Sequence, residues 1–163
     1  MMHDEQLKPV VDRLLATRRA RVEETQGGTR RGMRVLFTSH SGRNKLLAAQ
    51  LFASELAVDL FEIDLGRIVS RYIGDTEKNL DAFFAAAMAS DAVLLFDDTE
   101  HLFGESNGNG DFEESGRYAN FDAKLLRARI ETYDGVVLIG ADDPEHVDPT
   151  LAKQCDEVVA LDD

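Results

Sequence analysis

Residues 34–46 read RVLFTSHSGRNKL, an apolar run followed by a short polar turn and a lysine. The run Val35, Leu36 and Phe37 is typical of a buried strand. Residues 44–57, NKLLAAQLFASELA, carry the apolar spacing of a helix. A buried strand, a turn and a helix in this order predict the first unit of a parallel α/β sheet.

The same alternation of strand and helix patterns continues along the chain. We expect strands over residues 34–39, 58–65, 92–98, 135–141 and 157–162, and helices over 44–57, 76–90 and 117–133. Because the expected strands are apolar throughout, helices should cover both faces of the sheet. The fold class is therefore α/β, a three-layer parallel sheet with helices on both faces.

Two segments lie outside this alternation. Residues 5–24 predict a leading helix, and 25–32 are a Gly-rich basic linker. We accordingly divide the chain into residues 1–32, a helix with its linker, and residues 33–163, a single core domain. A length of 163 residues suits one domain of ordinary size.

The charge is distributed unevenly and excludes some classes of partner. The net charge is −13, and residues 91–163 alone carry 5 basic and 19 acidic side chains. Such a surface repels nucleic-acid backbones and anionic lipid, so we expect neither nucleic acid nor membrane as a partner. The single cysteine excludes an internal disulfide, and the charged N-terminal residues show no apolar signal core. We expect a cytoplasmic protein.

The first turn partly fits a phosphate-binding pattern, G-x-x-x-x-G-K-[ST]. In that pattern backbone N–H groups and the lysine hold phosphate oxygens, and the hydroxyl binds Mg²⁺. Lys45 fits, whereas Ser39 and Asn44 replace the two glycines and Leu46 replaces the hydroxyl residue. The sequence leaves two readings open: a phosphate loop that has lost its parts, or a strand-to-helix turn that never had them. The nucleotide-binding candidates are Ser39, His40, Ser41, Gly42, Arg43, Asn44, Lys45 and Leu46.

Acidic residues end two other predicted strands. Asp97 and Asp98 follow the third strand, and Asp142 follows the fourth. Ligands of parallel sheets bind beyond the carboxyl ends of the strands, so these side chains should face the same crevice as Lys45. Asp97 is the candidate ligand for Mg²⁺, and Asp98 the candidate that orients an attacking water.

Four stretches together resemble the α/β core of AAA+ ATPases, a family of P-loop nucleotide hydrolases. They are RVLFTS with its lysine (34–45), VSRYIGDTEKNLDAFF (69–84), AVLLFDDTEHLFG (92–104) and IETYDGVVLIGADD (130–143). The resemblance covers roughly residues 33–161. It implies a five-stranded sheet in the order 5-1-4-3-2, with ATP and Mg²⁺ as ligands.

The resemblance also assigns roles to single residues. Asp142 stands at the position called sensor 1, where the family has a neutral residue, and Lys153 stands where it has an arginine finger. Asp98 stands for the catalytic glutamate and is one methylene shorter. The chain ends at the fifth strand, before the helical lid that the family carries. Tyr72, Ile73 and Gly74 match a pore loop that grips polypeptide, although Tyr72 and Ile73 can equally pack under the next helix.

These departures predict an AAA+-type module that is degenerate in hydrolysis and acts in the assembly or regulation of a protein complex, within a ring of AAA+ subunits. One alternative is a weakly active, Mg²⁺-dependent ATPase that uses Lys45, Asp97 and Asp98. The second alternative is a scaffold protein that binds no nucleotide.

Overall fold

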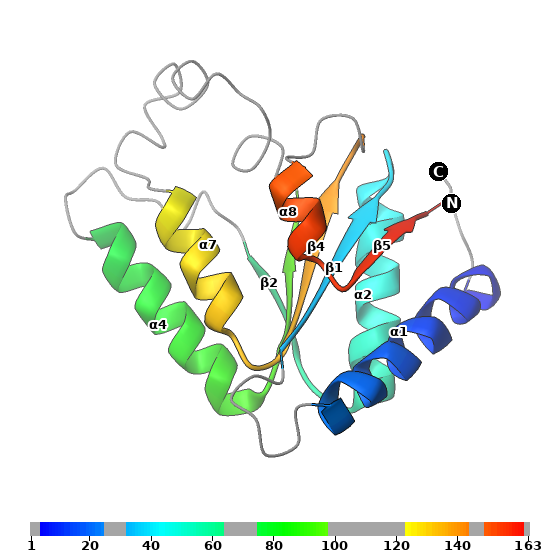
Figure 1. Ribbon diagram of the computed structural model, residues 1–163, viewed down its shortest axis with the longest axis horizontal. Coiled ribbons are helices and arrows are strands. Elements are labelled where there is room, and N and C mark those ends of the chain that lie inside the picture. Colours follow the sequence, from blue (N-terminus) through cyan, green and yellow to red (C-terminus); the bar gives the residue numbers. More distant parts are fainter. Residues whose placement is uncertain (1–3, 25–31, 64–74, 98–122, 144–148, 162–163) are drawn as a thin grey trace.

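A computed structural model describes residues 4–24, 32–63, 75–97, 123–143 and 149–161. They form one sheet of five parallel strands in the order β2-β3-β4-β1-β5, as expected. Figure 1 shows the strand arrows running in the same direction between two groups of helices. The strands are β1 (Met33–Thr38), β2 (Leu60–Ile63), β3 (Val93–Phe96), β4 (Val136–Ala141) and β5 (Glu157–Ala160).

Strand β1 lies inside the sheet, and its register decides which loops meet. All six of its residues are buried. It pairs with β4 along its whole length, from Met33 opposite Val136 to Thr38 opposite Ala141, and with β5 on its other side. Because β1 and β4 end at the same level, the residues that follow Thr38 and Ala141 come out side by side at the carboxyl edge of the sheet.

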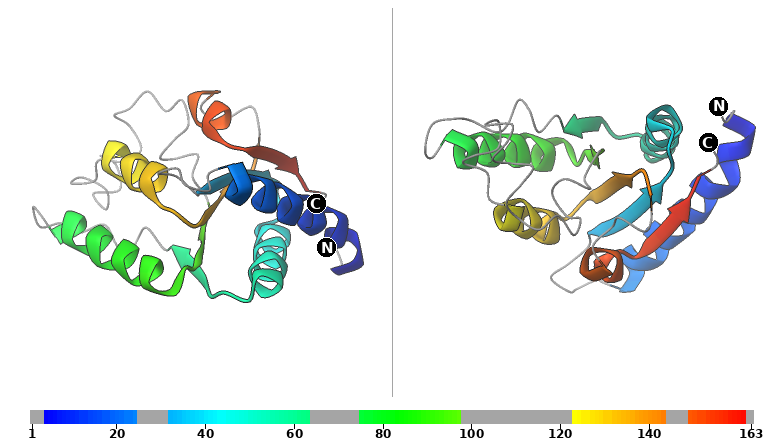
Figure 2. Two further views of the ribbon diagram at one scale, coloured as in Figure 1. Left: turned by 60° about the horizontal axis from the view of Figure 1, so that its bottom comes forward. Right: turned by 90° about the horizontal axis from the view of Figure 1, so that it is seen from above.

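Helices cover both faces, as Figures 1 and 2 show. Helices α1 (Asp4–Glu24) and α2 (Gly42–Leu56) cover one face, where Leu7, Leu14 and Phe52 pack in a core with β1. Helices α4 (Asp75–Ser90) and α7 (Ala123–Thr132) cover the other face with a second core, which includes Leu80, Phe84 and Ile130. Apolar burial on both faces explains why the strands lack polar alternation. Helix α8 (Pro149–Gln154) precedes β5.

Helix α2 begins earlier than its apolar pattern indicates. It starts at Gly42 instead of residue 44, because the Ser41 hydroxyl accepts a hydrogen bond from the Asn44 backbone N–H and caps the helix. Its last turn ends at Ala57, which adopts the left-handed conformation at φ 58° and donates its N–H back to the helix. The turn between β1 and α2 is therefore only three residues long, Ser39 to Ser41.

Several predicted features fall outside the described residues. These are the linker at 25–31, the pore-loop candidates Tyr72, Ile73 and Gly74, and the acidic residue Asp98. The division of the chain at residue 32 stays a prediction. Among the described helices, none is both long and apolar enough to cross a bilayer.

Candidate functional site

The turn after β1 satisfies part of its own hydrogen bonding with serine hydroxyls. The Ser41 backbone N–H donates to Ser39 Oγ at 3.0 Å, and the Asn44 N–H donates to Ser41 Oγ at 3.1 Å. The Ser39 N–H continues the pairing with β4 by donating to the Ala141 carbonyl. This is the geometry of a capped strand-to-helix turn, and both readings that the sequence leaves open are compatible with it.

Lys45 lies in the first turn of α2, and its side chain is almost wholly buried, at 1% exposure. Its ammonium Nζ lies 2.9 Å from Asp97 Oδ1 and donates a hydrogen bond to Asp142 Oδ1 at 3.0 Å. The carboxylates come from the ends of β3 and β4, so three strand ends meet at one cation. The predicted convergence of Lys45, Asp97 and Asp142 is present in the structure.

The Asp97 carboxylate lies in a narrow space between α2 and β4. A β-carbon at Gly140 would lie 2.5 Å from Asp97 Oδ1 and 3.1 Å from Lys45 Cδ. A β-carbon at Gly42 would lie 3.3 Å from Asp97 Oδ2. Gly140 therefore leaves the room in which the ion pair forms. The sequence reasoning missed Gly140, although a glycine near the end of an apolar strand is a known sign of close approach by another group.

Burial and charge act in opposite directions on Lys45. Burial by itself lowers the pKa of Lys45, but the hydrogen bonds that its ammonium donates to Asp97 and Asp142, together with the charges of these carboxylates, outweigh it, and the pKa is raised above the ordinary 10.5. Lys45 is thus a permanent cation at neutral pH. With two carboxylates around one ammonium, the cluster carries a net charge of −1.

Two of the described residues bear on the expected Mg²⁺ ligands, Leu46 and Asp97. Leu46 is partly buried and packs against the apolar core under α2, so position 46 contributes packing and no oxygen ligand. Asp97, the candidate metal ligand, is already paired with Lys45. Within the described ranges, no group of three or more histidine, cysteine or acidic side chains could hold a metal ion.

The other candidates lie apart from this cluster or outside the described residues. His40 and Arg43 are exposed, whereas Asn44 is fully buried. Lys153, at the finger position, is exposed in the last turn of α8.

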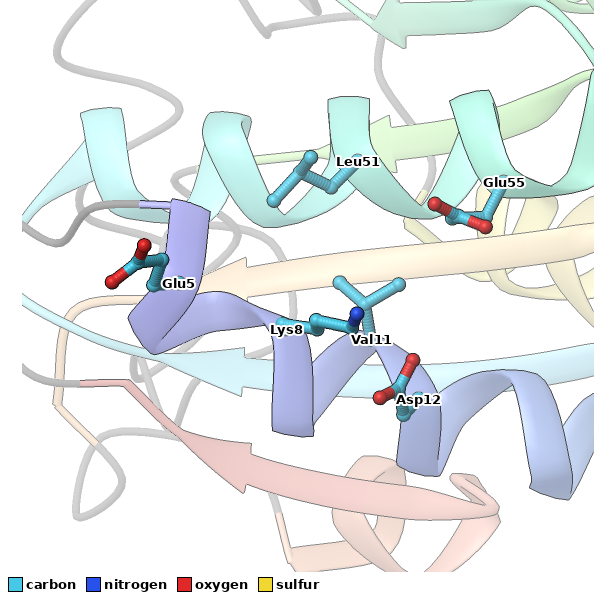
Figure 3. Close-up of a pocket in the computed structure, with 6 residues that line it drawn as sticks. All are labelled: Glu5, Lys8, Val11, Asp12, Leu51 and Glu55. Atoms are coloured by element: carbon cyan, nitrogen blue, oxygen red, sulfur yellow. The ribbon is translucent and has the colours of Figure 1, made fainter.

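A separate cavity of about 320 Å³ lies between α1 and α2. Figure 3 shows Val11 of α1 and Leu51 of α2 on its two sides, with carboxylates at its rim. The lining residues are Glu5, Lys8, Val11, Asp12, Leu51 and Glu55. Three carboxylates against one ammonium disfavour phosphate, and no residue of the β1–α2 turn lines this cavity.

The chain is similar to known proteins over the region that forms the sheet and its site. Residues 35–163 match the family described as "ATPase family associated with various cellular activities (AAA)". The chain is 29% identical over 140 residues to a protein of Sinorhizobium fredii named uncharacterized AAA family ATPase y4kL. It is 28% identical to human fidgetin-like protein 1 over 123 residues, and 28% identical to the peroxisomal ATPase PEX6 of Arabidopsis thaliana over 132 residues.

These matches cover most of this chain but only part of each relative. The aligned region is 86%, 74% and 77% of this chain, and 42%, 18% and 14% of the three relatives in the same order. This chain therefore spans less than half the length of each of these three relatives.

Proposed function

The chain belongs to the AAA family, and from this premise we propose that it is a core module impaired in ATP hydrolysis that acts in the assembly or regulation of a protein complex. The observation that carries the proposal is the pairing of Lys45 with both Asp97 and Asp142. A lysine held in this way is not available to the β- and γ-phosphates that it would otherwise reach.

The Mg²⁺ side of the site supports the same proposal. Family membership implies ATP and Mg²⁺ as ligands in general, yet Leu46 packs against the core where the pattern has a hydroxyl ligand. Asp98, the position of the catalytic carboxylate, is one methylene shorter than glutamate. A displacement of about 1 Å at a reacting group costs on the order of 10²-fold in rate.

Loss of the arginine finger would affect neighbouring subunits as well. Lys153 carries one ammonium, whereas an arginine offers a planar fork that binds phosphate through two hydrogen bonds. We propose that catalysis in a mixed ring comes from intact AAA subunits, with this chain as a structural or regulatory member. Tyr72, Ile73 and Gly74 would then face the pore of the ring.

The proposed partners are proteins. A net charge of −13 disfavours nucleic acid and anionic lipid as binding surfaces, and a cytoplasmic location is part of the proposal. In a ring, the acidic residues of 91–163 would meet basic residues of an adjacent subunit, which favours one orientation of assembly over others.

The experiment is a calorimetric titration with ATP, with and without Mg²⁺, followed by steady-state turnover and sedimentation velocity. The variants are Lys45→Ala and, as a control, Lys78→Ala, which removes an exposed lysine from α4. We expect wild-type turnover at background level and, in sedimentation, mixed assemblies of this chain with an intact AAA subunit.

Two results would count against the proposal. Mg²⁺-dependent turnover that Lys45→Ala abolishes and Lys78→Ala preserves would establish the weakly active ATPase instead. The nucleotide-free scaffold would be favoured if this chain assembled only with copies of itself, and if ATP did not change that assembly.

A further inference from the structure

We propose that the Asp142 carboxylate is a built-in competitor of phosphate, which occupies the binding position at Lys45 and excludes polyphosphate ligands. The inference rests on the proposed function, because it concerns the same Lys45 site. It adds a named residue, a mechanism of exclusion and a substitution that should reverse it.

The Lys45 ammonium is surrounded by carboxylate oxygens of the protein itself. A lysine ammonium has three donor hydrogens. Two of these directions end on carboxylate oxygens, Asp97 Oδ1 at 2.9 Å and Asp142 Oδ1 at 3.0 Å. Carboxylate and phosphate oxygens are alike as acceptors for an ammonium, so Asp142 presents to Lys45 what an anionic ligand would present.

Backbone N–H groups of the turn between β1 and α2 also donate to side chains of the protein. Phosphate loops bind their ligand with N–H groups of the turn. Here the N–H of Ser41 donates to Ser39 Oγ and the N–H of Asn44 donates to Ser41 Oγ. Oxygen atoms of the protein thus take two donor directions of the cation and the N–H groups of two residues of the turn. The site is complementary to its own side chains.

The two carboxylates differ in packing and in exposure. Asp97 lies against Gly42 and Gly140, and its side chain is 39% exposed. Asp142 follows the last residue of β4, and its side chain is 55% exposed. Asp142 is therefore the more exposed of the two carboxylates, and Asp97 is the one packed against the two glycines.

The net charge of the cluster also opposes an incoming polyphosphate. The cluster of Lys45, Asp97 and Asp142 carries −1, and a polyphosphate adds several further negative charges within a few ångströms. Replacing Asp142 by asparagine brings the cluster to zero, removes the competing acceptor charge and leaves Asp97 to hold the lysine. Both changes favour an incoming anion.

The experiment compares anion binding by wild type, Asp142→Asn and Asp134→Asn. Asp134 is exposed before β4, at the opposite end of the same strand from Asp142, so its substitution makes the same charge change away from the site. The probes are inorganic tripolyphosphate, ATP and AMP, titrated by calorimetry without metal. Thermal unfolding of each variant verifies that it is folded.

We expect Asp142→Asn to bind tripolyphosphate and ATP at least about tenfold more tightly than wild type, the size of one hydrogen bond to a charged group. AMP, which lacks β- and γ-phosphates, should show no gain, and Asp134→Asn should match wild type. Asp142→Ala should show a gain similar to that of Asp142→Asn, since it also removes the competing carboxylate.

Three results would overturn the inference: no gain in a folded Asp142→Asn variant, an equal gain in Asp134→Asn, or a gain confined to asparagine and absent from alanine. The last would mean that the new amide binds the anion. These results can be told apart from a failure of the proposed function, which would be seen in wild-type turnover or assembly and not in the ratio of affinities between variants.

Discussion

The ammonium of Lys45 lies 2.9 Å from the carboxylate of Asp97, which joins the first turn of α2 to the end of β3. This contact connects two elements that are far apart in the sequence, at the edge where parallel strands place their ligands. Its energetic role can be measured apart from any ligand.

Replacing Lys45 by alanine should lower the free energy of unfolding by about 2–4 kcal/mol, because a buried stem and two ion pairs are lost together. Lys45→Met keeps the stem and should cost less. The matched control Lys78→Ala removes an exposed lysine and should change stability by less than about 0.5 kcal/mol. Urea unfolding measures all three.

The difference in unfolding free energy between wild type and Lys45→Met should depend on pH in a way that follows from the raised pKa of Lys45. A raised pKa in the folded state means that the stabilisation is fully present below the unfolded-chain value near 10.5, and fades as pH rises through the folded pKa. The gap between wild type and Lys45→Met should therefore stay constant from pH 7 to 9. A gap that closes within this window would contradict the ion pair.

Gly140→Ala should displace the Asp97 carboxylate, since the new β-carbon would lie 2.5 Å from Asp97 Oδ1. We expect a loss of about 1–2 kcal/mol in stability. In a Lys45→Met background the same substitution should cost clearly less, because the contact that it breaks is already gone. An equal loss of stability in both backgrounds would mean that the cost of Gly140→Ala does not come from the Lys45–Asp97 contact. Gly42→Ala, with a looser contact of 3.3 Å, is the control.

Ser41→Ala should lower stability by about 1 kcal/mol through loss of the helix cap on α2. Ser41→Asp should retain most of the stability, because aspartate caps helices as well as serine does. Ser54→Ala, at an exposed position in the last turn of the same helix, should be neutral or slightly stabilising. Thermal unfolding of the three variants distinguishes the cap from a general effect of losing a hydroxyl.

Cys155 should react slowly with iodoacetamide in the folded protein. Burial, with a smaller effect of Asp156, raises the pKa of the Cys155 thiol to about 12. At pH 8 this lowers the thiolate fraction by about a thousandfold, and the greater nucleophilicity of a basic thiolate recovers part of that loss. We expect native labelling to be at least about tenfold slower than labelling in urea.

The pH profile of this labelling provides its internal control. Cys155 is the only cysteine in the chain, so the modified residue is unambiguous. In the folded protein the rate should keep rising beyond pH 10, whereas in urea it should level off near pH 9 to 10. A native plateau below pH 10 would mean that the thiol is less shielded than the fold indicates.

The local pattern of residues was sufficient for the five strands and for helices α1, α2, α4 and α7, whereas α8 was not predicted. Apolar runs such as 34–38 and 135–141 are long enough to be recognised as buried strands, and the alternation with helices predicts a parallel sheet. The strand order came from the resemblance to AAA+ ATPases. Boundaries were less accurate, because the start of α2 depends on a cap made by Ser41 rather than on apolar spacing.

Sequence by itself determined which chemical groups are present: one lysine after the first strand, acids after the third and fourth, and a leucine where a hydroxyl is expected. Only the tertiary structure decided how they pair. Asp142 was expected to face the same crevice as Lys45, and the fold brings the two side chains into direct contact at 3.0 Å, 97 residues apart in the sequence. That distance depends on the register of β1 with β4 and on the missing side chain of Gly140, and neither is a local property of the chain.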